Sequence, residues 1–173
     1  MVFPPELLDF LERQALVPWA GLVYRHVFGD NSPVAENTSG ARWNPTGTAA
    51  LYVALERDSA VAEGDHAVAV QPLRPRIARW IYRLEVELRS VIDLSDGKVL
   101  AAAGVTAVEL GSDDLSACQL VGGATAWLGR DGLLVPSARH SGNNLVIFPA
   151  NVDPGAVLAI EGTREPIAPV ESA

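Results

Sequence analysis

The chain has 173 residues and carries 21 Asp and Glu against 13 Lys and Arg, which gives a net charge of −8. Binding nucleic acid through its phosphates requires clustered cations, so we expect no direct nucleic-acid binding. A single cysteine excludes an intrachain disulfide. No uncharged apolar segment approaches the roughly 20 residues that span a bilayer, and the N-terminus lacks a signal-peptide pattern. These features predict a soluble cytoplasmic protein.

Apolar residues make up 49% of the sequence, which is enough for one sizeable core. We expect a single domain over residues 1–173, with its core at about 21–149, because no linker or repeat divides the chain. Proline in the first turn favours a helix over 5–16, which Pro18 ends. The residues from 162 to 173 are expected to form a loose tail.

The remaining elements are predicted from hydrophobic periodicity and from Gly, Pro and Asp boundaries. Strands are expected at 20–28, 51–55, 78–88, 91–94, 133–135, 144–148 and 157–161. Helices are expected at about 58–70, 95–103 and 112–128, and loops at 29–41 and 71–76. Because strands and helices alternate without a regular βαβ pattern, the sequence predicts an α+β fold.

Apolar and charged residues alternate along the segment 78–88, as in a strand with one solvated side. We expect one set of side chains to be buried, namely Trp80, Tyr82, Leu84, Val86 and Leu88. The other set is expected in solvent, namely Arg79, Ile81, Arg83, Glu85 and Glu87. Glu85 and Glu87 are therefore interpreted as part of a charged surface and not as a catalytic acid pair.

The sequence lacks the residues that several common active-site chemistries require. The three histidines and Cys118 are too far apart in sequence to supply a zinc ligand pair, so we expect no metal. The G-x-S-x-G motif of serine hydrolases is absent. Cys118 lies among apolar residues of a helical pattern, and we interpret it as a buried structural cysteine. The pair Gly122-Gly123 lies inside the same pattern and lacks the fingerprint of a phosphate loop.

Two arginines stand in apolar or glycine-rich surroundings. Arg25 lies in the middle of the first strand, where a buried guanidinium must be paired with an internal acid or with a substrate phosphate. Arg42 follows Gly40, which lets a ligand approach the backbone, and an arginine suits a phosphate beside a flat base. We predict that Asn44 contacts the substrate with these arginines, and we interpret Trp43 as a buried loop anchor.

Three further polar residues complete the candidate site. The ring of Tyr52 can stack on a heterocycle, or it can simply be a core tyrosine. The carboxylate of Glu63, among alanines, can stabilise an oxocarbenium-like sugar as a cationic group leaves, although a solvated helix acid is the alternative. Ser137 follows a buried strand and can donate to a phosphate or ribose, or merely form a turn. Gly64 after Glu63 costs a helix about 1 kcal/mol.

At these residues the chain resembles the RES-domain family. The matching segments are YRHVF, SGARWNPTGTAALYVA, Glu63, CQLVGGATAWL and GLLVPSARHSGNNLVIFP, in this order. The resemblance implies an ADP-ribosyltransferase-like fold, with a split antiparallel sheet flanked by helices that binds NAD in a cleft. The positions that match the family's functional residues are Arg25, Arg42, Tyr52, Glu63 and Ser137.

The resemblance also implies a function. The family contains toxins of bacterial toxin–antitoxin pairs that break down NAD by hydrolysis or phosphorolysis, or transfer ADP-ribose to a protein. NAD is then the substrate, no prosthetic group is expected, and the partner is an antitoxin, often of the Xre type, which blocks the cleft. Inorganic phosphate is the alternative acceptor to water. A non-catalytic nucleotide-binding module, in which the arginines form only ion pairs, is the remaining alternative.

These considerations assign a role to each residue. The predicted catalytic residues are Glu63, Arg25 and Tyr52. The predicted substrate-binding residues are Arg42, Ser137 and Asn44. In this hypothesis the arginines hold the pyrophosphate, Tyr52 stacks near the nicotinamide ribose, and Glu63 stabilises the sugar cation as nicotinamide leaves.

Overall fold

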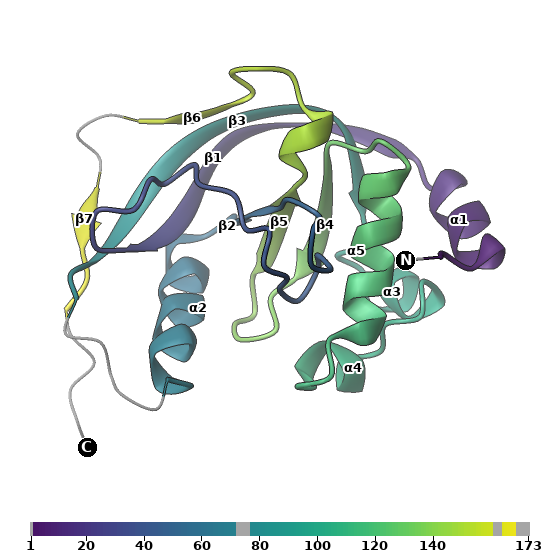
Figure 1. Ribbon diagram of the computed structural model, residues 1–173, viewed down its shortest axis with the longest axis horizontal. Helices are drawn as coiled ribbons and strands as arrows, with labels where there is room; N and C mark the ends of the chain where they lie inside the picture. Colours follow the sequence, from purple (N-terminus) through teal and green to yellow (C-terminus); the bar gives the residue numbers. More distant parts are fainter. Residues whose placement is uncertain (1, 72–76, 161–163, 169–173) are drawn as a thin grey trace.

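The computed structural model describes residues 2–71, 77–160 and 164–168, which form a mixed α+β domain (Figure 1). The helices are α1 (Pro5–Glu12), α2 (Arg57–Ala69), α3 (Gly97–Ala102), α4 (Ala107–Gly111), α5 (Ser116–Trp127) and the 3-10 helix η1 (Pro149–Asn151). The strands are β1 (Leu16–Phe28), β2 (Leu51–Ala54), β3 (Arg79–Asp93), β4 (Gly132–Pro136), β5 (Asn143–Ile147), β6 (Val157–Ala159) and β7 (Glu165–Pro166). Within the described ranges, no helix is long and apolar enough to cross a membrane.

The strands form one hydrogen-bonded sheet in the order β1-β2-β5-β4-β3-β6, with β7 beside β3. Because β3 also pairs with β1 over most of their lengths, the path returns to its first strand and closes. The expected split into two sheets is therefore not confirmed, and the β3–β4 pair is parallel instead of antiparallel. The pairing that closes the sheet is nevertheless short, because β1 and β2 share one registered pair, Tyr24 with Ala54.

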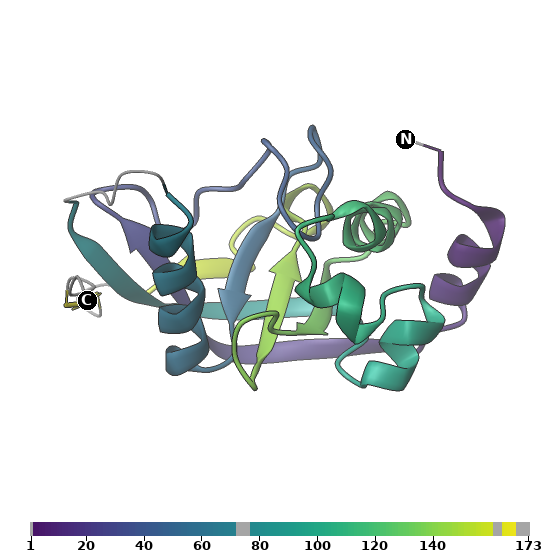
Figure 2. The same cartoon turned by 90° about the horizontal axis from the view of Figure 1, so that it is seen from below.

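Helices cover the closed sheet in two separate places. Alternate residues of the strands fill its inside, among them Val23, Val53, Leu84 and Leu145. Outside it, α1, α3 and α5 cover one apolar cluster, and α2 covers a second, smaller one. Strands β2, β4 and β5 lie between α2 on one side and α1, α3, α4 and α5 on the other in both views (Figures 1 and 2). The β4–β5 hairpin loop lies against α2, where His140 contacts Ser59.

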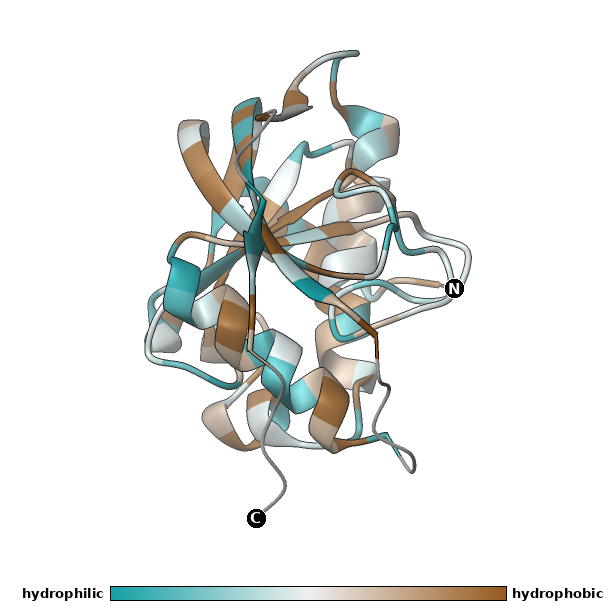
Figure 3. Cartoon of the chain, turned by 90° about the vertical axis from the view of Figure 1, so that its left-hand side faces the viewer, coloured by the Kyte–Doolittle hydropathy of each residue, from teal (hydrophilic) through white to brown (hydrophobic). Residues whose placement is uncertain are grey.

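The long strand β3 confirms most of the predicted alternation. Residues 83, 85, 87 and 89 are exposed and residues 84, 86 and 88 are buried, and alternating hydrophilic and hydrophobic bands follow the long strands in Figure 3. Arg79 and Ile81 were expected in solvent but are buried, because α2 packs over this end of the strand. Arg79 forms an ion pair with Asp65 of α2, with 2.5 Å between Nη2 and Oδ1.

The chain ends also differ from the prediction. The helix expected over 5–16 ends at Glu12, and β1 already begins at Leu16. Pro18 lies within β1 at a register shift between Val17 and Trp19, where its missing N–H is tolerated. In the tail, Glu165 accepts a hydrogen bond from Arg57 at 2.9 Å, so this part is held against α2. Residues 72–76, 161–163 and 169–173, which include parts of the predicted connector and tail, lie outside the described residues.

Candidate active site

Glu63 and Ser137 form the centre of the candidate site. Glu63 lies half-buried on α2, and its Oε1 accepts a hydrogen bond of 2.7 Å from the hydroxyl of Ser137, which follows β4. The same oxygen accepts a bond of 2.9 Å from Nδ2 of Asn144 on β5. The structure thus brings two predicted site residues, 74 positions apart in the chain, into direct contact.

Small residues allow α2 to approach the sheet at this point. A Cβ atom added to Gly64 would lie 2.3 Å from Cδ2 of His26 on β1. Ala60, one turn earlier, is also buried and packs with Ala54 and Ile81. The glycine that looks unfavourable in the helix is therefore required by close packing, and this packing sets how far Glu63 stands from the sheet.

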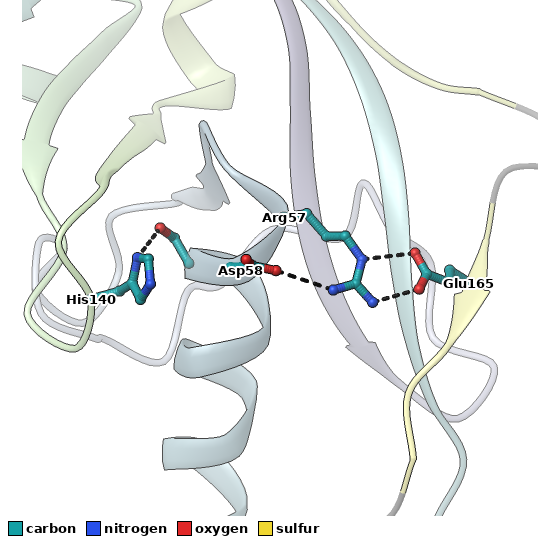
Figure 4. A network of polar contacts seen from close by, with 5 residues as sticks. Arg57, Asp58, His140 and Glu165 are labelled. Carbon is teal, nitrogen blue, oxygen red and sulfur yellow. Dashed lines mark hydrogen bonds and ion pairs between the residues drawn. The ribbon is translucent and has the colours of Figure 1, made fainter.

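The β4–β5 loop is fastened to α2 by a second contact, one helical turn before Glu63. The hydroxyl of Ser59, which is fully buried, lies 2.9 Å from Nδ1 of His140 in the loop (Figure 4). A Cβ on Gly142 would lie 2.4 Å from the same hydroxyl oxygen. The loop is also held internally, because the oxygen of Ser137 accepts the backbone N–H of His140 at 3.2 Å. These contacts fix the Ser137 hydroxyl opposite Glu63.

Asn144 is a candidate site residue that the sequence reasoning missed. It is opposite Ala54 and Val135 in the registers of β2 and β4 and lies two residues before Val146. Side chains of registered partners point to the same face, so Asn144 faces α2. The available signal was a polar residue in an apolar strand, at a position on the helix-covered outer face of the sheet.

Arg25 does not contact Glu63. Neighbouring side chains of a strand point to opposite faces, and His26 faces α2, so Arg25 is directed to the other side of β1. Its guanidinium donates to the carbonyl oxygens of Pro33 and Ala35 at 2.7 and 2.6 Å. Burial lowers the pKa of Arg25 to about 10. In the described part of the chain this cation forms no ion pair with a carboxylate.

Arg42 is held by the end of a helix. Its Nη1 donates to the carbonyl oxygens of Leu110 and Ser112 at 2.7 and 3.1 Å, where α4 ends. Carbonyl groups at a helix C-terminus carry partial negative charge and are natural partners of an arginine. The two arginines, which were expected to act together on one pyrophosphate, are thus bound to different loops.

Tyr52 and Asn44 anchor the loop between β1 and β2. The hydroxyl of Tyr52 accepts the backbone N–H of Trp43 at 2.8 Å and donates to Oδ1 of Asn44 at 2.7 Å. Desolvation by burial raises the pKa of this phenol. Asn44 is fully buried, and its Nδ2 donates to the carbonyls of Asn37 and Thr48. The prediction that Asn44 contacts the substrate does not agree with this burial, because the loop occupies the amide.

The interpretation of Trp43 as a buried loop anchor and of Cys118 as a structural cysteine is confirmed. Trp43 is 2% exposed, and a Cβ on Gly122 of α5 would lie 1.8 Å from the carbonyl oxygen of Trp43. The helix therefore needs glycine where the loop backbone crosses it. Cys118 on the same helix is fully buried, and desolvation by burial raises the pKa of its thiol.

A separate cavity of about 790 Å³ lies between the 45–49 loop, α5 and η1. Phe3, Trp127 and Phe148 are among its lining residues. Among the residues that the structure describes, those that line the cavity include none of the six predicted site residues. The candidate active site at α2 is therefore distinct from this cavity.

Among the described residues, no group of three His, Cys, Asp or Glu side chains is placed to hold a metal ion.

Comparison with known proteins identifies the family. The sequence pattern of the RES domain matches residues 21–168. The chain belongs to the RES domain family. The match extends beyond the core expected at 21–149 and includes β7.

Relatives of this RES domain protein include the NAD(+) phosphorylase MbcT of Mycobacterium bovis and that of Mycobacterium tuberculosis. Each is 26% identical over 157 residues, which cover 86% of this chain and 84% of the relative. The crystal structure of the M. tuberculosis MbcT–MbcA toxin–antitoxin complex superposes with a TM-score of 0.84 at 22% identity, covering 96% of this chain and 94% of that chain. The fold is therefore shared with MbcT.

Proposed function

We propose that this RES domain protein is the toxin of a toxin–antitoxin pair and that it degrades NAD by cleaving the bond between nicotinamide and ribose. The support comes from its family, from its similarity to the NAD(+) phosphorylase MbcT over most of both chains, and from the environment of Glu63. Phosphorolysis is the favoured reaction because the named relatives are phosphorylases, and hydrolysis is the alternative.

The observation that carries the proposal is the one-sided binding of the Glu63 carboxylate. Both hydrogen bonds from Ser137 and Asn144 reach Oε1. In the described chain, no hydrogen bond or ion pair involves Oε2, so this oxygen is available to a ligand. A fixed carboxylate with one free oxygen can bind a ribose hydroxyl and stabilise positive charge on the sugar ring in the transition state.

The reaction needs no general acid. When the bond between the ribose C1 and the nicotinamide nitrogen breaks, its electron pair stays with nicotinamide and neutralises the pyridinium charge. The sugar is left with oxocarbenium character, which Glu63 stabilises electrostatically. A phosphate oxygen then forms the new bond to C1 and gives ADP-ribose 1-phosphate, whereas water gives ADP-ribose and a proton.

Arg25 is the better of the two arginine candidates for the pyrophosphate. Among the described residues, its guanidinium donates hydrogen bonds only to carbonyl oxygens, and burial lowers its pKa to about 10. A phosphate that replaced the carbonyls of Pro33 and Ala35 would supply the negative charge that this site lacks. Arg42 is the weaker candidate because the end of α4 holds its guanidinium.

The test is release of nicotinamide by the purified protein from NAD, with and without inorganic phosphate. We expect release, dependent on phosphate, and a loss of at least about a hundredfold in Glu63→Gln because the charge that stabilises the sugar cation is removed. The matched control is Glu87→Gln, the same change at an exposed position of β3. Absence of release by the unsubstituted protein, or equal release by Glu63→Gln, contradicts the proposal.

The alternative functions give different results in the same experiment. A protein ADP-ribosyltransferase would transfer labelled ADP-ribose to a macromolecule in excess of the free product. A non-catalytic module would bind NAD without releasing nicotinamide. We propose that the antitoxin is of the Xre type and covers Glu63, so coexpression with such a partner should suppress nicotinamide release.

A further inference from the structure

Asn144 shows an unusual combination of contacts. Its Nδ2 donates to Oε1 of Glu63 at 2.9 Å. Its other polar atom, Oδ1, is buried and has no hydrogen-bond partner among the described residues. The donation to a carboxylate fixes the orientation of the amide, because the flipped amide would place two acceptor oxygens against each other.

A buried acceptor without a partner lowers the stability of a folded protein. An apolar side chain of similar branching would avoid this cost on β5, where the next three residues, Leu145, Val146 and Ile147, are apolar and fully buried. Such unsatisfied groups in native structures call for a specific explanation. At Asn144 the explanation lies in the partner of its Nδ2, the carboxylate of Glu63.

The two donors on Glu63 have complementary effects. A single hydrogen bond from Ser137 would hold Oε1 but would leave the carboxylate free to turn about that bond. The second donor, Asn144, reaches the same oxygen from β5, a different element, and so restricts this rotation. Precise orientation of a charged group before the reaction is a main source of transition-state stabilisation.

We propose that Asn144 is a positioning residue for the reaction. It holds Glu63 so that Oε2 faces the ribose, and the unpaired Oδ1 is the stability cost of that arrangement. This inference rests on the proposed function. It concerns the orientation of Glu63 and not the binding of NAD, so it predicts an effect on the rate of bond cleavage more than on substrate affinity.

The test compares Asn144→Leu with Asn143→Leu. Asn143 is the neighbouring residue on β5, its side chain lies on the opposite face, and it makes no side-chain hydrogen bond to the described residues. We expect Asn144→Leu to lower kcat for nicotinamide release by about tenfold to a hundredfold. KM for NAD should stay within about threefold, and Asn143→Leu should change neither constant by more than about threefold.

The midpoint of thermal unfolding gives a second, independent measurement. Asn144→Leu should unfold at about the same temperature as the unsubstituted protein, because removal of the unpaired acceptor offsets the loss of the hydrogen bond to Glu63. A clearly lower midpoint would show that the amide is structural and would overturn the inference, as would an unchanged kcat. If the unsubstituted protein releases no nicotinamide, the proposed function fails, and the unfolding midpoint still decides whether Asn144 carries the stability cost.

Discussion

Gly64→Ala tests whether close packing of α2 sets the site. An added Cβ would lie 2.3, 2.5 and 2.7 Å from Cδ2, Cγ and Nε2 of His26. Ordinary contacts between such atoms begin at about 3.4 Å, so the ring or the helix must move by about 1 Å. The ring is restrained, because its Nε2 accepts a hydrogen bond of 3.0 Å from Nε of Arg79 and it forms a T-shaped contact with the ring of Phe28 at a centroid distance of 4.6 Å.

The magnitude follows from two opposing effects. Alanine in place of glycine favours a helix by about 1 kcal/mol, whereas forcing an extra methyl group into a packed site costs about 1–3 kcal/mol and occasionally more. With a contact this short we expect a net loss of about 2 kcal/mol, which lowers Tm by about 4–8 °C in a domain of this size. Displacement of α2 should also separate Glu63 from Ser137, so nicotinamide release should fall.

Thermal unfolding and the nicotinamide assay measure the two effects. The matched control is Gly97→Ala on α3, where an added Cβ meets no atom within 4 Å, and this variant should be as stable as the unsubstituted protein or more so. The double variant His26→Ala/Gly64→Ala should lose less stability than the sum of its single changes, because the smaller side chain makes room. A Gly64→Ala protein that unfolds at or above the original temperature refutes the reasoning.

Two further predictions concern groups near the site. Tyr52→Phe leaves the N–H of Trp43 without its hydrogen-bond partner, so we expect the free energy of unfolding to fall by about 1–3 kcal/mol. Its kcat should stay within about threefold of the unsubstituted protein's. A large loss of kcat at unchanged stability would instead show a direct role of Tyr52 in the reaction. Burial and the charge of Arg79 lower the pKa of His26 from 6.5 to about 4, so its unfolded form binds more protons between these values. Stability should therefore fall as pH drops from 6.5 to 4, by less than about 3 kcal/mol because the ring is only partly buried. Urea unfolding at several pH values should show that the stability of His26→Gln depends less on pH than that of the unsubstituted protein.

The sequence was sufficient for the family and the α+β fold class, and it predicted two residues of the candidate site that prove to be in contact. The resemblance identified Glu63 and Ser137, and the two side chains do meet. Hydrophobic periodicity also predicted most strands and helices, because a half-buried element leaves a clear pattern. It was less successful at 112–128, where α5 begins only at Ser116 after the separate helix α4.

The roles of the other polar residues could not be read from the sequence. The pattern of Arg42, Asn44 and Tyr52 suits a ligand. In the structure, however, Arg42 donates to the end of α4, and Tyr52 donates a hydrogen bond to Asn44. A polar group that fastens a loop and one that binds a substrate are the same residue types, and only burial and partners distinguish them. Asn144 was missed for the converse reason, since a lone amide in an apolar strand gives no motif.

The position of Glu63 is determined at two interfaces of α2, and both depend on glycine. Gly64 allows the helix to approach β1, and Gly142 allows the β4–β5 loop to approach Ser59. Between these interfaces the carboxylate is held by donors from the end of β4 and from β5. Because no single element carries the complete site, a change in the packing of any one of them should alter the orientation of Glu63. The two glycines therefore help to set the geometry of the candidate site, although they carry no reactive group.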